Sequence, residues 1–486
     1  MSDITNLEPK ELWGYFSEIC QIPHPSKKEH NMIEYVQNFG KSQGLETVTD
    51  DTGNVIIKKK ASPGMESRKT VVLQAHLDMV PQKNSDKVHD FEKDPIEAYV
   101  DGEWVTADGT TLGADNGIGI AAALAVLSSD DIKHGPVEAL FTIDEETGMT
   151  GANNLKPGYL DAEILINMDS EDEGELYVGC AGGIDITAEK TYKEEPVPSE
   201  MKVYRVDAKG MKGGHSGIDI PLGRANANQV LFRFLMQAES DLSIKLAESA
   251  GGDLRNAIPR EAHAIVGVSN EYVSDFEKLV KEYDSMYKDE YGDNEPDISL
   301  SCKETGKPSG FVPADEQYGI IRAVYGCPHG VLRMSTSMEG LVETSNNLAV
   351  VNVGKGKFEA LSLTRSSVDT AKDATAWKIA AIFQLMGAEI GLSGAYPGWK
   401  PNMKSPILKT MQEVYDKMFG KIPEIKAIHA GLECGIIAGA YPHLDMISFG
   451  PTIRYPHSPD EKVNIETVRK FWEFLVGTLE AIPEKE

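Results

Sequence analysis

Apolar residues early in the chain follow two patterns, one at helical spacing and one in short uninterrupted runs. Ser26 and Glu29 form the pair expected of a helix capping box, and Gly40 is expected to end the helix that follows. The apolar residues at helical spacing between them are Met32, Ile33, Val36 and Phe39. Short strands are predicted on both sides of a turn at Thr52 and Gly53.

Three apolar runs are predicted to be buried strands, at 71–75, 137–143 and 164–168. Each run stops at a polar cluster, and an apolar helix is predicted around 121–127, between the first two runs. Strands that alternate with helices in this way are typical of an α/β sheet. Ligands bind beyond the carboxyl ends of the strands in such sheets, so the polar clusters are the expected site.

The pattern of apolar and charged residues changes near residue 187 and returns to its first form near residue 397. Charged, strand-like stretches separated by helical ones occupy the middle of the chain, at 202–208, 262–268, 348–353 and 360–364. The pattern of the first part of the chain then returns, with a predicted strand at 444–449 and a last helix capped by Asn464. We therefore predict an α/β domain at 1–186 and 397–486, interrupted by an α+β domain at 187–396.

Composition and charge narrow the classes of function. The chain has 486 residues and a formal net charge of -28, which opposes binding to phosphate backbones and makes nucleic acid a poor partner. We find no apolar run approaching the roughly eighteen residues that span a bilayer, and the first residues lack the features of a secretory signal. Five scattered cysteines without a CxxC pair indicate neither a disulfide framework nor a thiolate zinc site. A cytoplasmic protein without a membrane partner is expected.

The first polar cluster places His76 at the end of an apolar run and Asp78 two residues later. An imidazole that binds a metal usually donates its second ring N–H to a carboxylate, which fixes the tautomer and the direction of the ring. Asp78 suits that orienting role. Taken alone, a histidine at a strand end is more often a hydrogen-bonded structural residue, so the pair needs support from other clusters.

Further carboxylates follow a glycine-rich turn and the second apolar run. Asp115 lies in the segment LGADNGIG, where an ordinary helix N-cap is the alternative interpretation. Glu145 and Glu146 follow Asp144 directly, and like charges so close together repel unless a cation or a proton intervenes. A solvated acidic loop would be the simpler interpretation if this cluster stood alone.

Asp169, just beyond the third run, and His457, in the segment HSPDE, complete a set of two histidines and three carboxylates. Imidazole mixed with carboxylate suits zinc, cobalt or manganese better than calcium, which prefers oxygen ligands throughout. Five ligands exceed what one catalytic zinc takes while it keeps an open position. The sequence therefore predicts two ions.

Seven segments of the chain together resemble the di-zinc aminopeptidase and carboxypeptidase superfamily that includes aminoacylases. They are HLDMV, LGADNGIG, DEETGMTGA, NMDSEDEGELYVGC, GGHSG, HAGLECG and HSPDE. The likeness covers nearly the whole chain and is strongest to the branch of aminoacyl-histidine dipeptidases, also called cytosolic non-specific dipeptidases or bacterial carnosinases. It implies a zinc-peptidase-like catalytic domain, with a mixed sheet flanked by helices, and an inserted domain that acts as a lid.

The same resemblance implies a role for each residue of the polar clusters. It implies two ligand sets that share one bridging carboxylate, namely His76, Asp115 and Asp169, and Asp115, Glu146 and His457. Asp78 would orient His76, and Glu145 would be the general base for a water activated by the two ions. The peptide bond between Asp115 and Asn116 would be cis.

Four residues outside these clusters are candidates for contacts with the substrate. The resemblance implies that His215, in GGHSG, stabilises the oxyanion from the same chain or from a partner subunit, with an ordinary turn histidine as the alternative. Arg365 and Asn256 are candidates for binding the substrate carboxylate, although an arginine on a strand is usually a solvated charge. Glu433, in HAGLECG, is a candidate for meeting the free ammonium group, with a hydrogen-bonded loop glutamate as the alternative.

The expected function is metal-dependent hydrolysis of unsubstituted dipeptides, Xaa-His and others. Two divalent ions per chain are expected, Zn²⁺ with Co²⁺ or Mn²⁺ as substitutes, and a homodimer is left open. An aminoacylase or carboxypeptidase acting on N-blocked amino acids would use the same metal centre and is one alternative. A metal-binding relative that has lost turnover is another, and the presence of both Glu145 and His215 argues against it.

Overall fold

The computed structural model describes residues 4–485, and the chain divides into two compact units. Unit 1 comprises Met1–Gly179, Pro401–Ala427 and Leu432–Glu486, and unit 2 comprises Cys180–Lys400 and Ile428–Gly431. The boundary expected at 186/187 falls inside strand β9 (Gly182–Thr191) of unit 2. The charged residues Glu189 and Lys190 lie in the second half of β9, so the charged pattern becomes clear only after the chain has entered unit 2.

Unit 1 is built on a mixed eight-stranded sheet in the order β1-β2-β6-β3-β7-β21-β8-β20. Its central strands β6, β3, β7 and β21 are parallel, and the strands on either side of them pair antiparallel. The strands are β1 Glu46–Thr49, β2 Val55–Lys59, β3 Val71–His76, β6 Val137–Thr142, β7 Ile164–Asn167, β8 Glu175–Cys180, β20 Glu424–Ile428 and β21 Asp445–Ser448. The three apolar runs are β3, β6 and β7, and every residue in them is buried.

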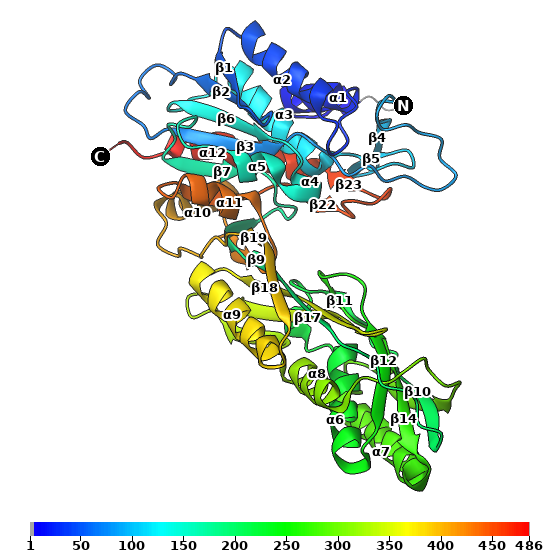
Figure 1. Ribbon diagram of the computed structural model, residues 1–486. Coiled ribbons are helices and arrows are strands. Elements are labelled where there is room, and N and C mark those ends of the chain that lie inside the picture. The colour runs from blue at the N-terminus through cyan, green and yellow to red at the C-terminus, as the bar shows by residue number, and fades with distance from the viewer. Residues whose placement is uncertain (1–3, 486) are drawn as a thin grey trace. The chain divides into compact units, whose positions relative to one another are not determined.

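Helices pack around this sheet, with α3 against β3, α2 against β1 and β2, and α10 against β21 (Figure 1). The helices of unit 1 are η1 Ile4–Asn6, α1 Lys10–Cys20, α2 His30–Ser42, α3 Ala114–Ser128, α4 Glu145–Gly148, α5 Thr150–Asn154, α10 Pro406–Phe419, α11 Glu433–Ala440 and α12 Ile465–Ala481. The predicted cap of α12 is confirmed, because the Asn464 side chain accepts the N–H of Thr467 at 3.1 Å. A second, four-stranded sheet has the order β22-β23-β5-β4, with β4 Ala98–Asp101, β5 Trp104–Ala107, β22 Ile453–Arg454 and β23 Lys462–Asn464.

The capping box predicted before α2 does not form. The Ser26 hydroxyl donates instead to Asp78 Oδ2 at 2.8 Å, and the Glu29 carboxylate accepts the backbone N–H groups of Lys27 and Asp144. The helix also runs through Gly40 to Ser42. Asp78 and Asp144, which engage these two side chains, are distant from them in sequence, and a local motif cannot reveal such partners.

Unit 2 is built on a nine-stranded sheet, in which β15-β10-β14-β12-β17-β18-β9-β19 are neighbours and β16 pairs with β17. Besides β9, its strands are β10 Met201–Lys209, β12 Lys245–Gly251, β14 Ala262–Ser269, β15 Ser299–Glu304, β16 Gly330–Met334, β17 Val342–Gly354, β18 Lys357–Ser366 and β19 Glu389–Tyr396. The helices are η2 Ile220–Leu222, α6 Ala227–Leu242, η3 Asn270–Tyr272, α7 Val273–Tyr291, α8 Ala314–Gly326 and α9 Asp369–Leu385. A two-stranded ribbon pairs β11 Gly214–His215 with β13 Ala257–Ile258. An α/β domain interrupted by an α+β domain is thereby confirmed.

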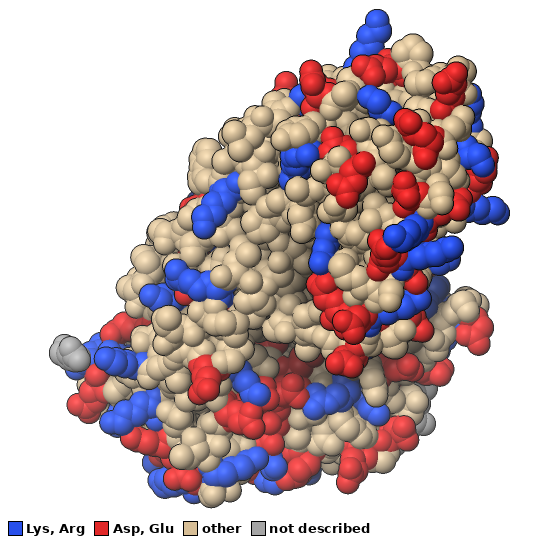
Figure 2. Space-filling model, turned by 90° about the horizontal axis from the view of Figure 1, so that it is seen from below, with Lys and Arg blue, Asp and Glu red and all other residues tan. Residues whose placement is uncertain are grey.

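Charged side chains of both signs lie on the face of the molecule shown in Figure 2. On the face shown in Figure 2, acidic and basic side chains are interspersed around a broad area of uncharged residues. No helix in residues 4–485 is long and apolar enough to cross a membrane.

Gly450, in the segment after β21, lies against the backbone of the segment after β7. A methyl group at Gly450 would lie 1.7 Å from the backbone oxygen of Ser170, the residue after Asp169. We expect Gly450→Ala to lower the free energy of unfolding by about 3 kcal/mol, measured by urea denaturation, because one backbone must move. Gly14→Ala is the control, since nothing lies within 4 Å of that site in helix α1, and it should stabilise the protein by up to about 1 kcal/mol. Equal stabilities of the two variants would contradict this close approach.

Candidate active site

The parallel strands of unit 1 deliver three polar segments to one edge of the sheet. His76 is the last residue of β3, Asp169 comes two residues after β7, and α4 begins at Glu145, three residues after β6. β3 pairs in parallel with both β6 and β7, so their carboxyl ends are neighbours. The predicted polar clusters therefore meet at the edge where α/β sheets bind ligands.

His76 is buried and has a different partner on each ring nitrogen. Its Nδ1 lies 3.0 Å from the carbonyl oxygen of Asp78 and 3.4 Å from Asp78 Oδ1. Its Nε2 lies 3.2 Å from Asp115 Oδ1 and 3.2 Å from Asp169 Oδ1. Donation from Nδ1 to Asp78 fixes the ring and directs Nε2 at the two carboxylates.

Asp78 also holds the start of α4. Its carboxylate accepts the backbone N–H of Glu145 at 2.9 Å and that of Glu146 at 3.2 Å. Burial acts to raise the pKa of Asp78, but the hydrogen bond and charge of His76 outweigh it and lower this pKa to about 2. One ionised carboxylate thus positions both the imidazole and the two glutamates.

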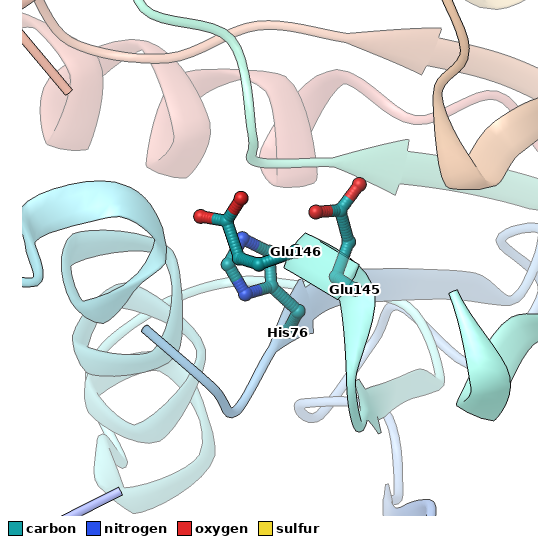
Figure 3. Close-up of side chains that lie close together, drawn as sticks. All are labelled: His76, Glu145 and Glu146. Carbon is teal, nitrogen blue, oxygen red and sulfur yellow. The ribbon is translucent and has the colours of Figure 1, made fainter. Parts of the chain in front are cut away.

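Glu145 and Glu146 lie in the short helix α4, whereas the sequence predicted them at the end of a strand. Figure 3 shows their side chains leaving α4 separately, with the Glu146 carboxylate beside the His76 ring. Successive residues of a helix are separated by about 100° around its axis, so the two carboxylates differ in direction without lying on opposite faces. Burial raises the pKa of Glu145 well above its usual range.

The five predicted ligands form two groups that share Asp115. Within each group the atoms that could bind a metal all lie within 4.8 Å of one another. The groups are His76, Asp115 and Asp169, and Asp115, Glu146 and His457. The peptide bond between Asp115 and Asn116 is cis, as the resemblance implied, and the Asn116 amide donates to Asp169.

The second group carries an excess of negative charge. Hydrogen bonds from His457 to Asp115 and then to Glu146 raise the pKa of this histidine to about 11. Glu146 Oε1 is buried and has no hydrogen-bond partner among residues 4–485. A carboxylate oxygen that is both buried and unpaired needs a positively charged or donating partner.

A buried polar network that the sequence analysis missed lies beside these groups. Gln74, two residues before His76 on β3, donates to Glu433 Oε2 at 2.6 Å and accepts from the Asn167 amide. The Thr142 hydroxyl donates to the same Glu433 oxygen at 2.7 Å, and the Ser448 hydroxyl donates to Asn167. The network joins β6, β3, β7 and β21 at their carboxyl ends. A glutamine inside an otherwise apolar strand was the available signal.

Glu433, predicted to meet a substrate ammonium group, is fully buried at the start of α11. Burial raises its pKa to about 7, although the charge of His76 and the Thr142 hydroxyl act in the opposite direction. Within the described chain, its Oε1 has no hydrogen-bond partner. One oxygen is therefore held by the protein and the other is left without a donor.

His215 belongs to unit 2, where its tautomer is fixed by the backbone. Its Nδ1 accepts the N–H groups of Gly217 at 3.2 Å and Ile218 at 3.1 Å, so the neutral ring carries its proton on Nε2. Burial, followed by the positive charge of Arg365, lowers the pKa of His215. The ring is therefore a neutral donor through Nε2.

Arg365 and Asn256 lie close to the same turn of unit 2. The Arg365 Nε donates to Ser216 Oγ at 3.4 Å, and Nη1 donates to the Tyr396 hydroxyl at 2.8 Å. Arg365 is buried, contrary to the alternative of a solvated strand arginine. The Asn256 carbonyl accepts the N–H of Ser216 at 2.8 Å, and its side chain is exposed.

Comparison with known proteins identifies the family. The profile of peptidase family M20/M25/M40 matches residues 72–481. The chain is 47% identical over 485 residues to the cytosol non-specific dipeptidase of Escherichia coli (strain K12), covering 100% of both proteins. It is 50% identical, with a TM-score of 0.96, to the crystal structure of aminoacylhistidine dipeptidase from Vibrio alginolyticus, covering 100% of this chain and 99% of that one. The aminopeptidase PepT structure from Bacillus cereus, at 16% identity and a TM-score of 0.58 over 98% of this chain and 99% of that one, shares the fold. The chain belongs to peptidase family M20/M25/M40.

Proposed function

We propose that this protein is a dipeptidase that depends on two divalent metal ions. The observation that carries the proposal is Asp115, which belongs to two adjacent groups of potential ligands, one with His76 and Asp169 and one with Glu146 and His457. The names of the relatives from Escherichia coli and Vibrio alginolyticus, which align over their full or nearly full length, support a dipeptide substrate.

The residues of the two groups fit divalent ions. Two imidazole nitrogens and three carboxylates suit zinc, cobalt or manganese. The buried, unpaired Glu146 Oε1 and the strongly raised pKa of His457 both indicate that positive charge belongs at this position. His76 and Asp169 would hold one ion, Glu146 and His457 the other, and Asp115 both. Bound ions supply the charge that acidifies water and polarises the scissile carbonyl.

Glu145 is the proposed general base. It is not a member of either ligand group that contains Asp115, yet it lies within 4.8 Å of His76 and Glu146. Asp78 holds its backbone, so the carboxylate is presented from a fixed turn. We assign to it the transfer of a proton from the attacking water to the leaving amine nitrogen.

His215 is the proposed donor to the carbonyl oxygen as negative charge develops there. Its backbone-fixed tautomer supplies a neutral Nε2–H, and its lowered pKa keeps the ring in that form near neutral pH. Subunit mixing tests whether this histidine serves its own chain or a partner subunit.

The substrate's two charged ends have separate candidates. Glu433 Oε1, buried and unpaired, suits a free ammonium group, while Arg365, positioned by Ser216 and Tyr396, suits a carboxylate. Asn256 is proposed to assist Arg365. Recognition of a free ammonium group favours unsubstituted dipeptides, Xaa-His among them, over N-blocked amino acids.

The name of the Escherichia coli relative supports a cytosolic location.

Chelation is expected to abolish dipeptide hydrolysis, and zinc, cobalt or manganese to restore it. The same preparation should hydrolyse dipeptides and leave the matching N-acetyl amino acids intact, because the acetyl group removes the ammonium charge that Glu433 would meet. Metal analysis should give two ions per active chain. Full activity with one ion would overturn the two-ion assignment, and preferred cleavage of N-acetyl substrates would make the protein an aminoacylase.

A further inference from the structure

Glu461 is a buried carboxylate that binds one continuous stretch of backbone. Its Oε2 accepts the N–H groups of Leu112 at 2.7 Å and Gly113 at 3.0 Å. Its Oε1 accepts those of Ala114 at 2.8 Å and Asp115 at 3.3 Å. Glu461 is 2% exposed, so the four bonds are shielded from water. A single side chain therefore fixes residues 112–115, the turn at the start of α3. This Asp115 turn ends at the carboxylate shared by the two ligand groups.

The other end of Glu461 is anchored just as firmly. Its carbonyl oxygen accepts the Thr106 hydroxyl at 2.8 Å, and its own N–H donates to the Ser458 carbonyl at 3.0 Å. The next residue, Lys462, begins β23, which pairs with β5 in the four-stranded sheet. The backbone of Glu461 is thus held next to the four-stranded sheet, and its side chain extends to the Asp115 turn.

His457 lies four residues before Glu461 on a turn that needs such support. Its φ is 59° and that of Tyr455 is 56°, both in the left-handed region that residues other than glycine rarely adopt. The His457 side chain is 50% exposed, so burial alone does not hold it in place. Its Nε2 nevertheless lies 2.9 Å from Glu146 Oε2 and 3.4 Å from Asp115 Oδ2.

We propose that Glu461 is a positioning residue that couples the turn carrying Asp115 to the turn carrying His457, and so sets the affinity of the centre for its ions. The inference rests on the proposed function, because it assigns both residues to the metal centre. Glu461 itself binds no ion in this proposal. It acts by keeping two ligands from separate segments at one spacing before an ion arrives, which lowers the conformational cost of binding.

The chemistry of the side chain makes the proposal specific to a carboxylate. All four bonds need an acceptor, and an ionised carboxylate offers only acceptors. Glutamine has the same shape but turns an NH₂ group toward two of the N–H donors, leaving them unpaired. Aspartate keeps the charge but is shorter by one methylene, so it cannot reach the turn from the same backbone position.

The test is a titration of the metal-free full-length protein with Zn²⁺ in competition with a chromophoric chelator. Glu461→Gln is expected to weaken zinc binding by about tenfold to a hundredfold, the range seen when a residue that orients a ligand is changed. Glu461→Asp, which keeps the charge, is expected to weaken it as well and serves if the glutamine variant does not fold.

Glu138→Gln is the matched control. Glu138 is also a buried carboxylate of unit 1 that accepts a backbone N–H, that of Asp161, at 3.0 and 3.1 Å. It lies near the beginning of β6, whereas α4 follows the end of that strand. The control should lose thermal stability and keep the zinc affinity of the natural protein.

The outcomes separate this inference from the proposed function. Unchanged zinc affinity in either folded Glu461 variant would overturn the positioning role while leaving the metal centre intact. Equal weakening in Glu138→Gln would overturn it too, since any buried carboxylate of unit 1 would then have the same effect. A natural protein that binds no zinc, cobalt or manganese would instead overturn the proposed function.

Discussion

Glu145→Gln is expected to lower the turnover number by about a hundredfold to ten-thousandfold, with both ions still bound. The amide has nearly the same shape as the carboxylate but cannot accept a proton from water. The backbone bond from Glu145 to Asp78 does not involve the changed group, so α4 should keep its position. The measurement is the turnover number on a dipeptide beside the metal content of the same sample.

The adjacent Glu146→Gln is the matched variant, because it makes the same substitution one residue further along α4. It removes a charge from the group that contains Asp115 and His457, so metal content is expected to fall toward one ion per chain. Full metal content with high activity in Glu145→Gln would remove that residue as the base. Metal loss in Glu145→Gln and not in Glu146→Gln would mean that the two roles are exchanged.

His215→Ala is expected to reduce turnover by about a hundredfold or more while changing the Michaelis constant little. A donor that acts on charge developing in the transition state contributes little to binding of the ground state. Gly217, which is buried, and Ile218, which is exposed, donate to the His215 ring, so the loss of the ring also leaves these two backbone N–H groups without that acceptor. Turnover close to normal would remove His215 from the mechanism.

His215→Asn provides a control for the backbone. An asparagine can still accept a backbone N–H locally, yet it does not reproduce the position of the imidazole Nε2. It should therefore remain as slow as His215→Ala.

Mixing His215→Ala with Glu145→Gln distinguishes action of His215 on its own chain from action on a partner subunit. Activity above that of both parent variants would assign the histidine to a partner subunit. Absence of such activity in a proven mixed dimer would assign it to the same chain.

Much of the framework follows from local sequence. The apolar runs of β3, β6 and β7 are uninterrupted because both faces of a central strand are buried, and each run stops where polar residues take over. Asn464 caps α12 because the acceptor for a helix N–H sits in the same few residues. Patterns of this kind depend on neighbours in the chain.

Predictions from local sequence were wrong where a side chain forms hydrogen bonds with a distant segment of the chain. Ser26 and Glu29 have the spacing of a capping box, but Asp78 and the Asp144 backbone engage them instead. The acidic residues after β6 form the helix α4 and not a strand end, because Asp78 accepts their first N–H groups. These partners are remote in sequence, so the competing bonds are invisible to spacing.

The sequence by itself determined which residue types are available for chemistry: two histidines and three carboxylates in separate motifs, each after an apolar run or a turn. Their arrangement into two groups around Asp115, which the resemblance implied, arises in the tertiary structure. The residues come from strand ends, from the starts of α3 and α4 and from the His457 turn, and within each group the potential ligand atoms lie within 4.8 Å of one another. It also decided that Glu461, present in a recognised motif but without an assigned role, binds the Asp115 turn through four N–H groups. A hydrogen bond depends on distance in space, and folding alone brings residues 112–115 and 461 together.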